Sequence, residues 1–536
     1  MLQPLQVLKR YRPHAGTLAT LLAERVAVAP TRDALVFEGH AISYVELQRH
    51  AERAAVVYAE RGVRPGDRIG VMSRNHPSTV VTLFALARLG AVMVPVNPDY
   101  RATEAGYVLG HAQVSGVLCS PEALTTVREA VAGLTPTPWL LLNREDAGGG
   151  GNDLPVLDAE LAATNGAVPP DAGTPEAPCL FIYTSGTTGF PKGVMHGQRT
   201  LLLAGEGFVQ RMYLQPDDRL LCLLPMFHIN ALFYSLAGAL AAGATLILLP
   251  RFSAGTFWQD VARTSATEAN TIAAVSNILL RRPRSEFVAG HRLRKIYGAP
   301  FSAETYEVFH REFGVPTLIE GYGMSEVPGA LNNPFEGPHK VGSMGRPSTH
   351  PDPTLQLAQL KIVDDDGHDL PDGRTGELVV KTPLVMQGYY RDPAQTAAAF
   401  RDGWFLTGDL AWRDPDGYFW FVARKKDIIR KRGENVSGAE LDRVIESHPD
   451  VLQAAAIPVP DALGEDEILV AVVRRPSATL DEAAVAQWCR ERLAAIKVPR
   501  YVVFVDALPL TPTHRVAKYQ LRADPTLRDR AVDLGE

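Results

Sequence analysis

Short apolar runs alternate with helical patterns from about Asp67 to Glu326, and this alternation limits the possible folds more than any other feature of the chain. The strand-like run 91–97, for example, directly follows a helix-like segment at 78–90. Further strand candidates lie at 270–276, 294–300 and 316–323. Strands and helices in a βαβα order are typical of parallel sheets that are covered by helices on both faces. We therefore predict an α/β fold.

An almost uncharged stretch, 220–249, is long enough to cross a bilayer. Pro225, His228 and Asn230 interrupt this stretch early, and Gly243 breaks it before a β-branched run. A buried strand, a buried helix and a second buried strand would give the same apolar composition. We predict this second arrangement, and no membrane span.

The chain has 536 residues and a net charge of -6. The length predicts roughly three or four core-sized units. The charge offers no basic field for nucleic acid, so we expect no nucleic-acid partner. The start of the chain lacks the apolar run of a signal peptide. The four cysteines are widely spaced and form no CxxC pair, which is typical of reduced thiols in a cytoplasmic protein. We expect a monomer or a homodimer.

The pattern changes after about Gly342, where short strands are punctuated by dipeptides typical of hairpin turns, such as Asp366-Gly367 and Asp416-Gly417. A charged run follows Arg424, and beyond it lies a small α+β pattern. We predict a large N-terminal domain over residues 1–424, made of two parallel α/β subdomains and a β-barrel-like subdomain. Residues 425–536 are predicted to form a small α+β C-terminal domain.

The segment 183–193, YTSGTTGFPKG, directly follows the apolar run CLFIY. Glycines let a backbone approach an oligophosphate, hydroxyls donate to its oxygens, and Lys192 adds a positive charge. The segment is not a Walker loop, because Pro191 precedes Lys192 and Gly193 follows it. A solvated Ser/Thr/Gly loop is the alternative. The predicted phosphate contacts are Thr184, Ser185, Gly186, Thr187, Thr188, Gly189 and Lys192.

This string resembles the signature of the adenylate-forming superfamily, which includes acyl-CoA ligases, peptide-synthetase adenylation domains and luciferases. Other motifs of that family follow in order: AVMVPVNP, PMFHIN, GYGMSE, GELVVK, WFLTGD and IKVPRYV. FSAGTFWQDV and RGENVSGAELDRVIESHP are similar to crotonobetaine/carnitine-type CoA ligases, one branch of the small- and medium-acid ligases. The resemblance implies that ATP activates a carboxylic acid as an acyl-adenylate, with release of pyrophosphate, and that the acyl group passes to CoA. Two alternatives are a non-CoA acceptor (an amine, a carrier protein or an inorganic nucleophile such as nitrite) and a nucleotide-binding protein with impaired catalysis.

The resemblance also implies roles for single residues around ATP. Tyr322 would stack on adenine, Ser325 would contact a phosphate, and Asp409 with Arg424 would hold the ribose hydroxyls. Glu326, with Thr184, would bind Mg²⁺, and a carboxylate oxygen is a ligand that this cation prefers. Without the resemblance, Glu326 would be read as a plain exposed glutamate and Asp409 as a turn residue. The other expected nucleotide contacts are Gly298, Ala299, Glu320, Gly321, Gly323, Met324 and Phe421.

His228 lies within an apolar run, where a lone histidine is more often a core residue than a functional one. The resemblance instead implies a catalytic gate beside the acyl pocket. Asn230 is neutral and offers no counter-charge to a trimethylammonium group, which disfavours carnitine and crotonobetaine as the acid. The expected lining of this substrate pocket is His228, Asn230, Val275, Ser276, Gly298, Ala299, Gly323 and Met324.

The resemblance makes the C-terminal domain mobile, with Lys426 as its hinge and Gly433 beside a tunnel for CoA. The family also places a catalytic lysine in a loop near the C-terminus. Aligned without a gap, that position holds Arg515 here, and a lysine follows only at Lys518. Arginine keeps the charge, but its planar fork donates in fixed directions. We expect either Arg515 or Lys518 to contact the carboxylate and the α-phosphate; a surface arginine without a catalytic role is the alternative.

Overall fold

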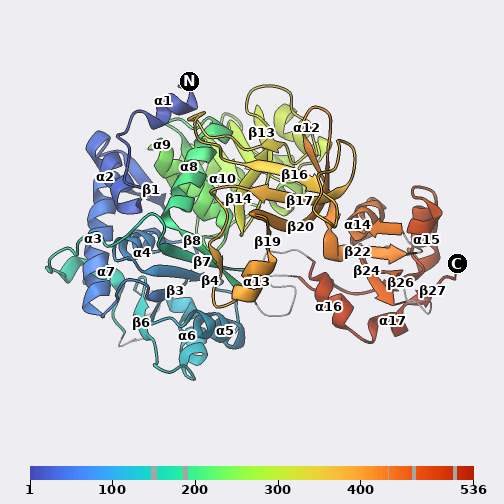
Figure 1. The fold of residues 1–536 in the computed structure, drawn as a ribbon, viewed down its shortest axis with the longest axis horizontal. Helices are drawn as coiled ribbons and strands as arrows, with labels where there is room; N and C mark the ends of the chain where they lie inside the picture. Colours follow the sequence, from blue (N-terminus) through green and yellow to red (C-terminus); the bar gives the residue numbers. More distant parts are fainter. Residues whose placement is uncertain (146–153, 185–190, 432–433, 461–465, 511–515, 536) are drawn as a thin grey trace. The chain divides into compact units, whose positions relative to one another are not determined.

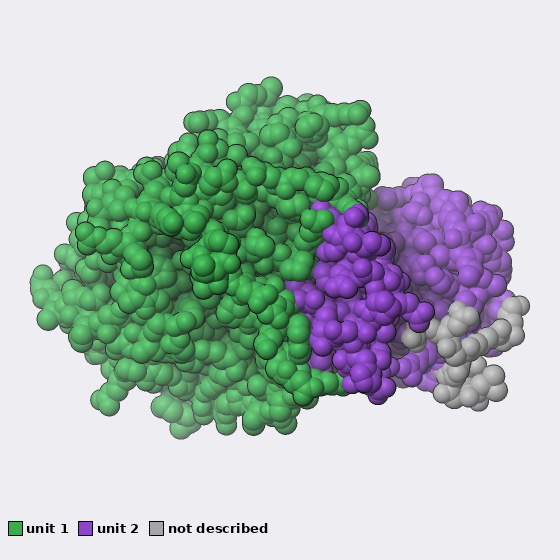
Figure 2. All heavy atoms as spheres, turned by 45° about the horizontal axis from the view of Figure 1, so that its top comes forward, with its two compact units in different colours: residues 1–186, 190–359, 380–405 green, residues 187–189, 360–379, 406–536 purple. Residues whose placement is uncertain are grey.

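The computed structural model describes residues 1–145, 154–184, 191–431, 434–460, 466–510 and 516–535 (Figure 1). The chain divides into two compact units, which Figure 2 shows in different colours. Unit 1 holds residues 1–186, 190–359 and 380–405, and unit 2 holds residues 187–189, 360–379 and 406–536. The predicted α/β class is confirmed. The domain boundary expected between residues 424 and 425 stays a prediction.

A seven-stranded sheet in unit 1 holds the two ends of the predicted phosphate segment, Thr184 and Lys192, and its strands run in the order β18-β8-β7-β4-β3-β5-β6. The pairs from β7 to β6 are parallel, whereas β8 pairs antiparallel with both β7 and β18. Every residue of β4 is buried, as expected for a parallel strand that is covered on both faces. The strands are β3 (Arg68–Met72), β4 (Val92–Val96), β5 (Gly116–Cys119), β6 (Trp139–Leu142), β7 (Pro178–Thr184), β8 (Lys192–Gly197) and β18 (Gly388–Tyr389).

A nine-stranded sheet, also in unit 1, has the order β15-β14-β13-β12-β11-β9-β10-β1-β2. Its central strands are parallel, and the direction reverses at a turn between β13 and β14 formed by Ser325 and Glu326. The strands are β1 (Asp33–Phe37), β2 (His40–Ser43), β9 (Arg219–Cys222), β10 (Thr245–Leu248), β11 (Glu268–Asn270), β12 (Lys295–Gly298), β13 (Thr317–Met324), β14 (Val327–Asn332) and β15 (Arg346–Pro347).

Helices from all three chain segments of unit 1 complete this unit. They are α1 (Pro4–Leu8), α2 (Leu18–Val28), α3 (Tyr44–Glu60), α4 (Pro77–Arg88), α5 (Ala102–Ala112), α6 (Leu124–Val131), α7 (Leu157–Ala163), α8 (Gln198–Met212), α9 (Ala237–Ala242), α10 (Phe257–Thr264), α11 (Ala273–Arg281), α12 (Ala303–Arg311) and α13 (Pro393–Ala398). The largest hydrophobic core includes residues of α2, α3, α4, α8 and α9.

The uncharged stretch 220–249 folds as predicted into a strand, a helical segment and a strand. These are β9, a π-helical turn η2 (Asn230–Leu236) continued by α9, and β10. The strand residues are almost all buried, which explains why the stretch contains so few charges. Among the described helices, none combines the length and the apolar character that a membrane span requires.

The strand predicted over 270–276 is wrong. β11 ends at Asn270, and α11 begins at Ala273. The apolar residues Ile272, Val275 and Leu279 follow the period of a helix, but the prediction considered only the first seven residues of the run. The start of α11 therefore lies directly after the carboxyl end of a parallel strand.

Unit 2 contains a hairpin-rich part and an α+β part. β20 and β21 pair antiparallel around the predicted Asp416-Gly417 turn, with Asp409 opposite Arg424. The α+β order predicted beyond Arg424 is confirmed. The elements are β16 (Gln359–Val363), β17 (Gly376–Lys381), β20 (Trp404–Arg413), β21 (Phe419–Arg424), β22 (Ile428–Lys431), β23 (Glu434–Ser437), α14 (Gly438–Glu446), β24 (Val451–Pro460), β25 (Asp466–Arg474), α15 (Glu482–Arg490), β26 (Tyr501–Phe504), α16 (Lys518–Ala523), α17 (Leu527–Arg530) and β27 (Val532–Asp533).

Candidate functional site

Lys192 is the first residue of β8 and lies opposite Thr184, the last residue of β7. Its ammonium donates to Gln395 Oε1 on α13 and lies 5.2 Å from the centre of the Tyr389 ring. The hairpin register therefore fixes both ends of the predicted phosphate segment. Five of its predicted contacts, Ser185, Gly186, Thr187, Thr188 and Gly189, lie outside the described residues.

The GYGMSE motif forms the end of β13 and the turn that follows it. Glu326 is only 9% exposed, and its Oε1 accepts a hydrogen bond of 2.9 Å from the Tyr389 hydroxyl. Its backbone carbonyl accepts from Met386 N at 2.8 Å. His196 Nε2 lies 2.7 Å from Ser325 O, so that nitrogen carries the proton. Lys192 and Glu326, distant in sequence, therefore share a neighbour in Tyr389.

Glu320 is 1% exposed and lies near the end of β13, where its carboxylate has three donors. Oε1 accepts from Phe301 N at 2.9 Å, and Oε2 accepts from Gly342 N at 3.0 Å and from the Tyr306 hydroxyl at 3.3 Å. Burial raises the pKa of Glu320 to about 7, in spite of these hydrogen bonds. Glu320 thus ties β13 to the segment after β12, where the predicted residue Ala299 lies.

Two glycines of the predicted acyl pocket are enclosed by protein atoms. A Cβ at Gly298 would lie 2.7 Å from Thr271 Oγ1, and one at Gly323 would lie 2.5 Å from Gly329 N. Val275 and Ser276, on α11, are buried. These contacts explain why glycine stands at both positions without any ligand.

His228 and Asn230 lie before and at the start of η2 and are half-buried. The His228 ring lies 4.4 Å from that of Phe227. Asn230 Oδ1 is buried and has no hydrogen-bond partner among the described residues. A buried amide oxygen without a partner is rare in folded proteins and points to a group that the free protein does not supply.

Asp409 and Arg424 form an ion pair across β20 and β21 in unit 2, with Nε and Oδ1 2.7 Å apart. Asp409 is 1% exposed, whereas the Phe421 ring is 41% exposed. The predicted hinge residue Lys426 belongs to the short helix η4 (Lys425–Asp427). Gly433 lies outside the described residues.

Lys518, one of the two cations considered for the C-terminal loop, begins α16 in unit 2. Its ammonium lies 2.5 Å from Asp442 Oδ2 on α14, and the two side chains are 13% and 19% exposed. Asp442 also accepts from Ala456 N at 2.6 Å. Lys518 thus holds α16 against α14. Arg515 lies outside the described residues.

Three residues beside the site were missed by the sequence analysis: His196, Tyr389 and Gln395. Their contacts span 129, 63 and 203 positions along the chain. No short-range pattern relates such distant positions. The Gly-Tyr-Tyr string at 388–390 is the one local signal, and it indicates a strand rather than a partner for Glu326.

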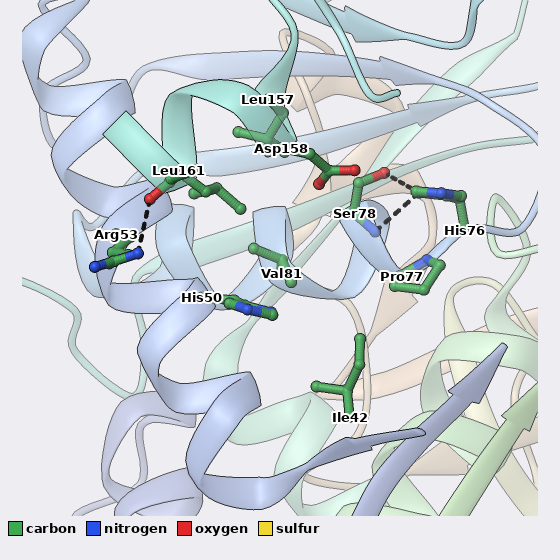
Figure 3. A pocket seen from close by; sticks show the side chains of 11 residues that line it. Ile42, His50, Arg53, His76, Pro77, Ser78, Val81, Leu157, Asp158 and Leu161 are labelled. Atoms are coloured by element: carbon green, nitrogen blue, oxygen red, sulfur yellow. Dashed lines mark hydrogen bonds between the residues drawn. The ribbon is translucent and has the colours of Figure 1, made fainter. Parts of the chain in front are cut away.

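A cavity of about 400 Å³ lies elsewhere in unit 1, between α3, α7 and the start of α4 (Figure 3). Arg53 donates from Nη1 to Leu161 O at 3.1 Å, and the His76 ring and the Ser78 hydroxyl lie 2.8 Å apart. Burial lowers the pKa of His76 to about 4, so this side chain is neutral at pH 7. None of the predicted site residues lines the cavity, which is therefore separate from the predicted nucleotide site.

Comparison with known proteins identifies the family of the chain. Residues 22–390 match the AMP-binding enzyme family, and residues 440–515 match the AMP-binding enzyme C-terminal domain. The chain is 36% identical over 510 residues to a sulfoacetate–CoA ligase from Cupriavidus necator. This match covers 94% of this chain and 97% of the relative. It is also 31% identical over 505 residues to a crotonobetaine/carnitine–CoA ligase from Salmonella paratyphi C. That match covers 92% of this chain and 96% of the relative. The crystal structure of ATP-bound MatB from Rhodopseudomonas palustris has a TM-score of 0.82 at 31% identity and covers 94% of this chain and 98% of that one.

Proposed function

The chain belongs to the family of AMP-binding enzymes, and from this premise we propose that it is an AMP-forming acid–CoA ligase. A carboxylate oxygen of the acid attacks the α-phosphorus of ATP, the bond to the pyrophosphate oxygen breaks, and an acyl-adenylate forms. The sulfur of CoA then attacks the acyl carbon, and AMP leaves. The observation that carries this proposal is the near full-length similarity to enzymes that are named as CoA ligases.

In the first step, Lys192 and Glu326 act on the phosphate charge: Lys192 binds it directly, and Glu326 holds the cation that neutralises it. The Lys192 ammonium binds phosphate oxygens after exchanging its contact with Gln395. Mg²⁺, when bound, neutralises the charge of the departing pyrophosphate. The site fits such a cation, because one oxygen of the Glu326 carboxylate accepts from Tyr389 while no described residue donates to the other. Thr184, which adjoins Lys192, is the second proposed contact of the cation.

The nucleoside has its own set of proposed contacts. Tyr322 faces adenine, Asp409 accepts from the ribose hydroxyls, and Arg424 keeps the Asp409 carboxylate oriented through their 2.7 Å ion pair. Ser325 donates its hydroxyl to a phosphate oxygen, and the bond from His196 to its carbonyl fixes the backbone of the same residue. The remaining proposed contacts are Gly298, Ala299, Glu320, Gly321, Gly323, Met324 and Phe421.

The acid occupies the space beside η2. His228 controls access to the reacting carboxylate, and Asn230 supplies a polar partner to the rest of the acid. Since the Asn230 amide is neutral and offers no counter-charge, an acid without a trimethylammonium group is favoured. Val275 and Ser276 close the inner wall.

In the second step, rotation about Lys426 gives CoA access past Gly433. Arg515 supplies the cation that bridges carboxylate and α-phosphate during adenylation, because Lys518 is engaged by Asp442. Removal of this cation by the same rotation would free the acyl carbon for the thiol.

The experiment that tests the proposed function is acid-dependent exchange of labelled pyrophosphate into ATP, followed by mass spectrometry after CoA is added. The first panel of acids is sulfoacetate, oxalate, indoleacetate and crotonobetaine, each taken from the name of a CoA ligase that is 31% to 36% identical to this chain. We expect exchange and a matching acyl-CoA with at least one small acid. Exchange without any thioester would assign the acceptor to another class, and no exchange across a broad acid panel would refute the proposal.

A further inference from the structure

The turn formed by Ser325 and Glu326 is bonded to β8 and to the segment just before β18, and these two strands pair with each other. β8 begins at Lys192 and carries His196, which donates to the Ser325 carbonyl at 2.7 Å. The segment just before β18 contributes Met386, whose N–H donates to the Glu326 carbonyl at 2.8 Å. The backbone of the turn is therefore fixed from two strands, independently of the Glu326 side chain.

Tyr389 is the one described residue that contacts the charged groups of both Lys192 and Glu326. Its hydroxyl donates to Glu326 Oε1 at 2.9 Å, and the centre of its ring lies 5.2 Å from Lys192 Nζ. A hydroxyl satisfies a carboxylate with a neutral donor, and an aromatic face attracts an ammonium without neutralising it.

The position of Tyr389 is set by its backbone. Tyr389 lies opposite Val194 in the β18–β8 register, and its N–H donates to Thr396 Oγ1 at 2.9 Å. The next residue, Tyr390, donates from its N–H to the Gly193 carbonyl at 2.8 Å. The backbone at Tyr389 is thus bonded to α13 and to β8, independently of the two charges.

Among the described residues, no ion pair joins Lys192 to Glu326, although both charges are near Tyr389. A direct pair would consume the two charges that an ATP–metal complex needs, since the carboxylate oxygens and the ammonium protons would satisfy each other. We propose that Tyr389 is a positioning residue that keeps Lys192 and Glu326 apart and directs one Glu326 oxygen toward the cation of the ATP complex. This inference rests on the proposed function, because it assigns the cation and the phosphates to these two residues.

Tyr390 provides a matched control in the neighbouring position. Its hydroxyl donates to Gln113 Oε1 at 3.3 Å, and its ring packs against Phe181, so it contacts neither charge. Tyr389→Phe and Tyr390→Phe each remove one hydroxyl from the same short segment and keep the ring. A general effect of losing a hydroxyl in this segment would therefore change both variants equally.

The test is calorimetric titration of each protein with Mn²⁺–ATP and with metal-free ATP, without any acid, together with thermal unfolding. Tyr389→Phe should weaken Mn²⁺–ATP binding about tenfold, the lower end of the effect of losing a hydrogen bond to a metal ligand. It should change the binding of metal-free ATP less than twofold, and Tyr390→Phe should change neither.

The inference is overturned if Tyr389→Phe behaves like Tyr390→Phe, or if it weakens metal-free ATP to the same extent as Mn²⁺–ATP. The titration needs no acid and no turnover, so it stands apart from the test of the proposed function. If wild-type protein binds Mn²⁺–ATP but shows no pyrophosphate exchange with any acid, the proposed function fails while the role of Tyr389 is still decided.

Discussion

Arg515 and Lys518 stand three positions apart, and the ion pair of Lys518 with Asp442 leads us to assign them different roles. Lys518→Ala should leave pyrophosphate exchange within about threefold of wild type, because the Lys518 ammonium is already paired with Asp442. It should lower the stability of unit 2 by about 1.5–3 kcal/mol, the range for a charged hydrogen bond. Exchange assays and thermal unfolding of the full chain measure the two effects.

Arg515→Ala is the matched comparison at the same scale. It should lower exchange by roughly a hundredfold or more, the range for losing one donor to the transition state. Asp442→Asn should resemble Lys518→Ala in unfolding. If Lys518→Ala abolishes exchange in a folded protein while Arg515→Ala does not, the assignment is reversed.

We propose that Asn230 contributes to the preference for the acid, since its buried Oδ1 has no partner among the described residues. Asn230→Ala should raise KM for the accepted acid about tenfold, the equivalent of one neutral hydrogen bond, and change KM for ATP less than twofold. Steady-state kinetics with each substrate varied in turn measure both constants. Equal changes in the two KM values would show that Asn230 supports the fold and not the acid.

At the scale of elements, Glu206 on α8 joins two distant segments. Its Oε1 lies 3.1 Å from His14 Nε2, and its Oε2 lies 3.0 Å from His350 Nε2. In both His14 and His350, Nδ1 accepts a hydrogen bond from a backbone N–H. The proton therefore lies on Nε2, which donates to the Glu206 carboxylate. Burial alone would raise the pKa of Glu206, but the hydrogen bonds from the two histidines outweigh it and lower the pKa to about 2.

A folded-state pKa below the unfolded value near 4.5 means that Glu206 stabilises the protein above pH 4.5 and loses this effect as the pH falls toward 2. The contribution is at most about 3 kcal/mol. Glu206→Gln should therefore lower the unfolding midpoint at pH 7, and its difference from wild type should shrink as the pH falls from 5 to 3. A difference independent of pH in this window would contradict the assignment.

The elements that the sequence predicted correctly are those with a repeated local pattern. The stretch 220–249 contains breaks at Pro225 and Gly243 that separate strand from helix, and the structure follows them. The run 270–276 contains no such break, and its strand prediction failed where β11 passes into α11. The neighbours of the predicted site residues were not predicted for another reason. Tyr389 contacts Glu326 across 63 positions of the chain, and no local sequence pattern encodes such a contact.

At the scale of the whole molecule, the proposed ligase must expose one acyl group to two partners in turn. We place the hinge for this change at Lys426, within η4 in unit 2. Lys426→Pro fixes φ near −65° and should therefore affect the two half-reactions unequally. We expect thioester formation to fall at least tenfold more than pyrophosphate exchange, measured on the same preparation. Equal losses in both assays would contradict a hinge at this residue.

The central claim, activation through an acyl-adenylate, is tested most directly by following oxygen. An accepted acid labelled with ¹⁸O in both carboxylate positions is incubated with ATP and CoA, and the AMP is analysed by mass spectrometry. Since the acid oxygen bonds to the α-phosphorus and stays there when sulfur takes the acyl carbon, one ¹⁸O per thioester should be found in AMP. Thioester formed with unlabelled AMP, or with ¹⁸O in inorganic phosphate, would contradict the proposed chemistry.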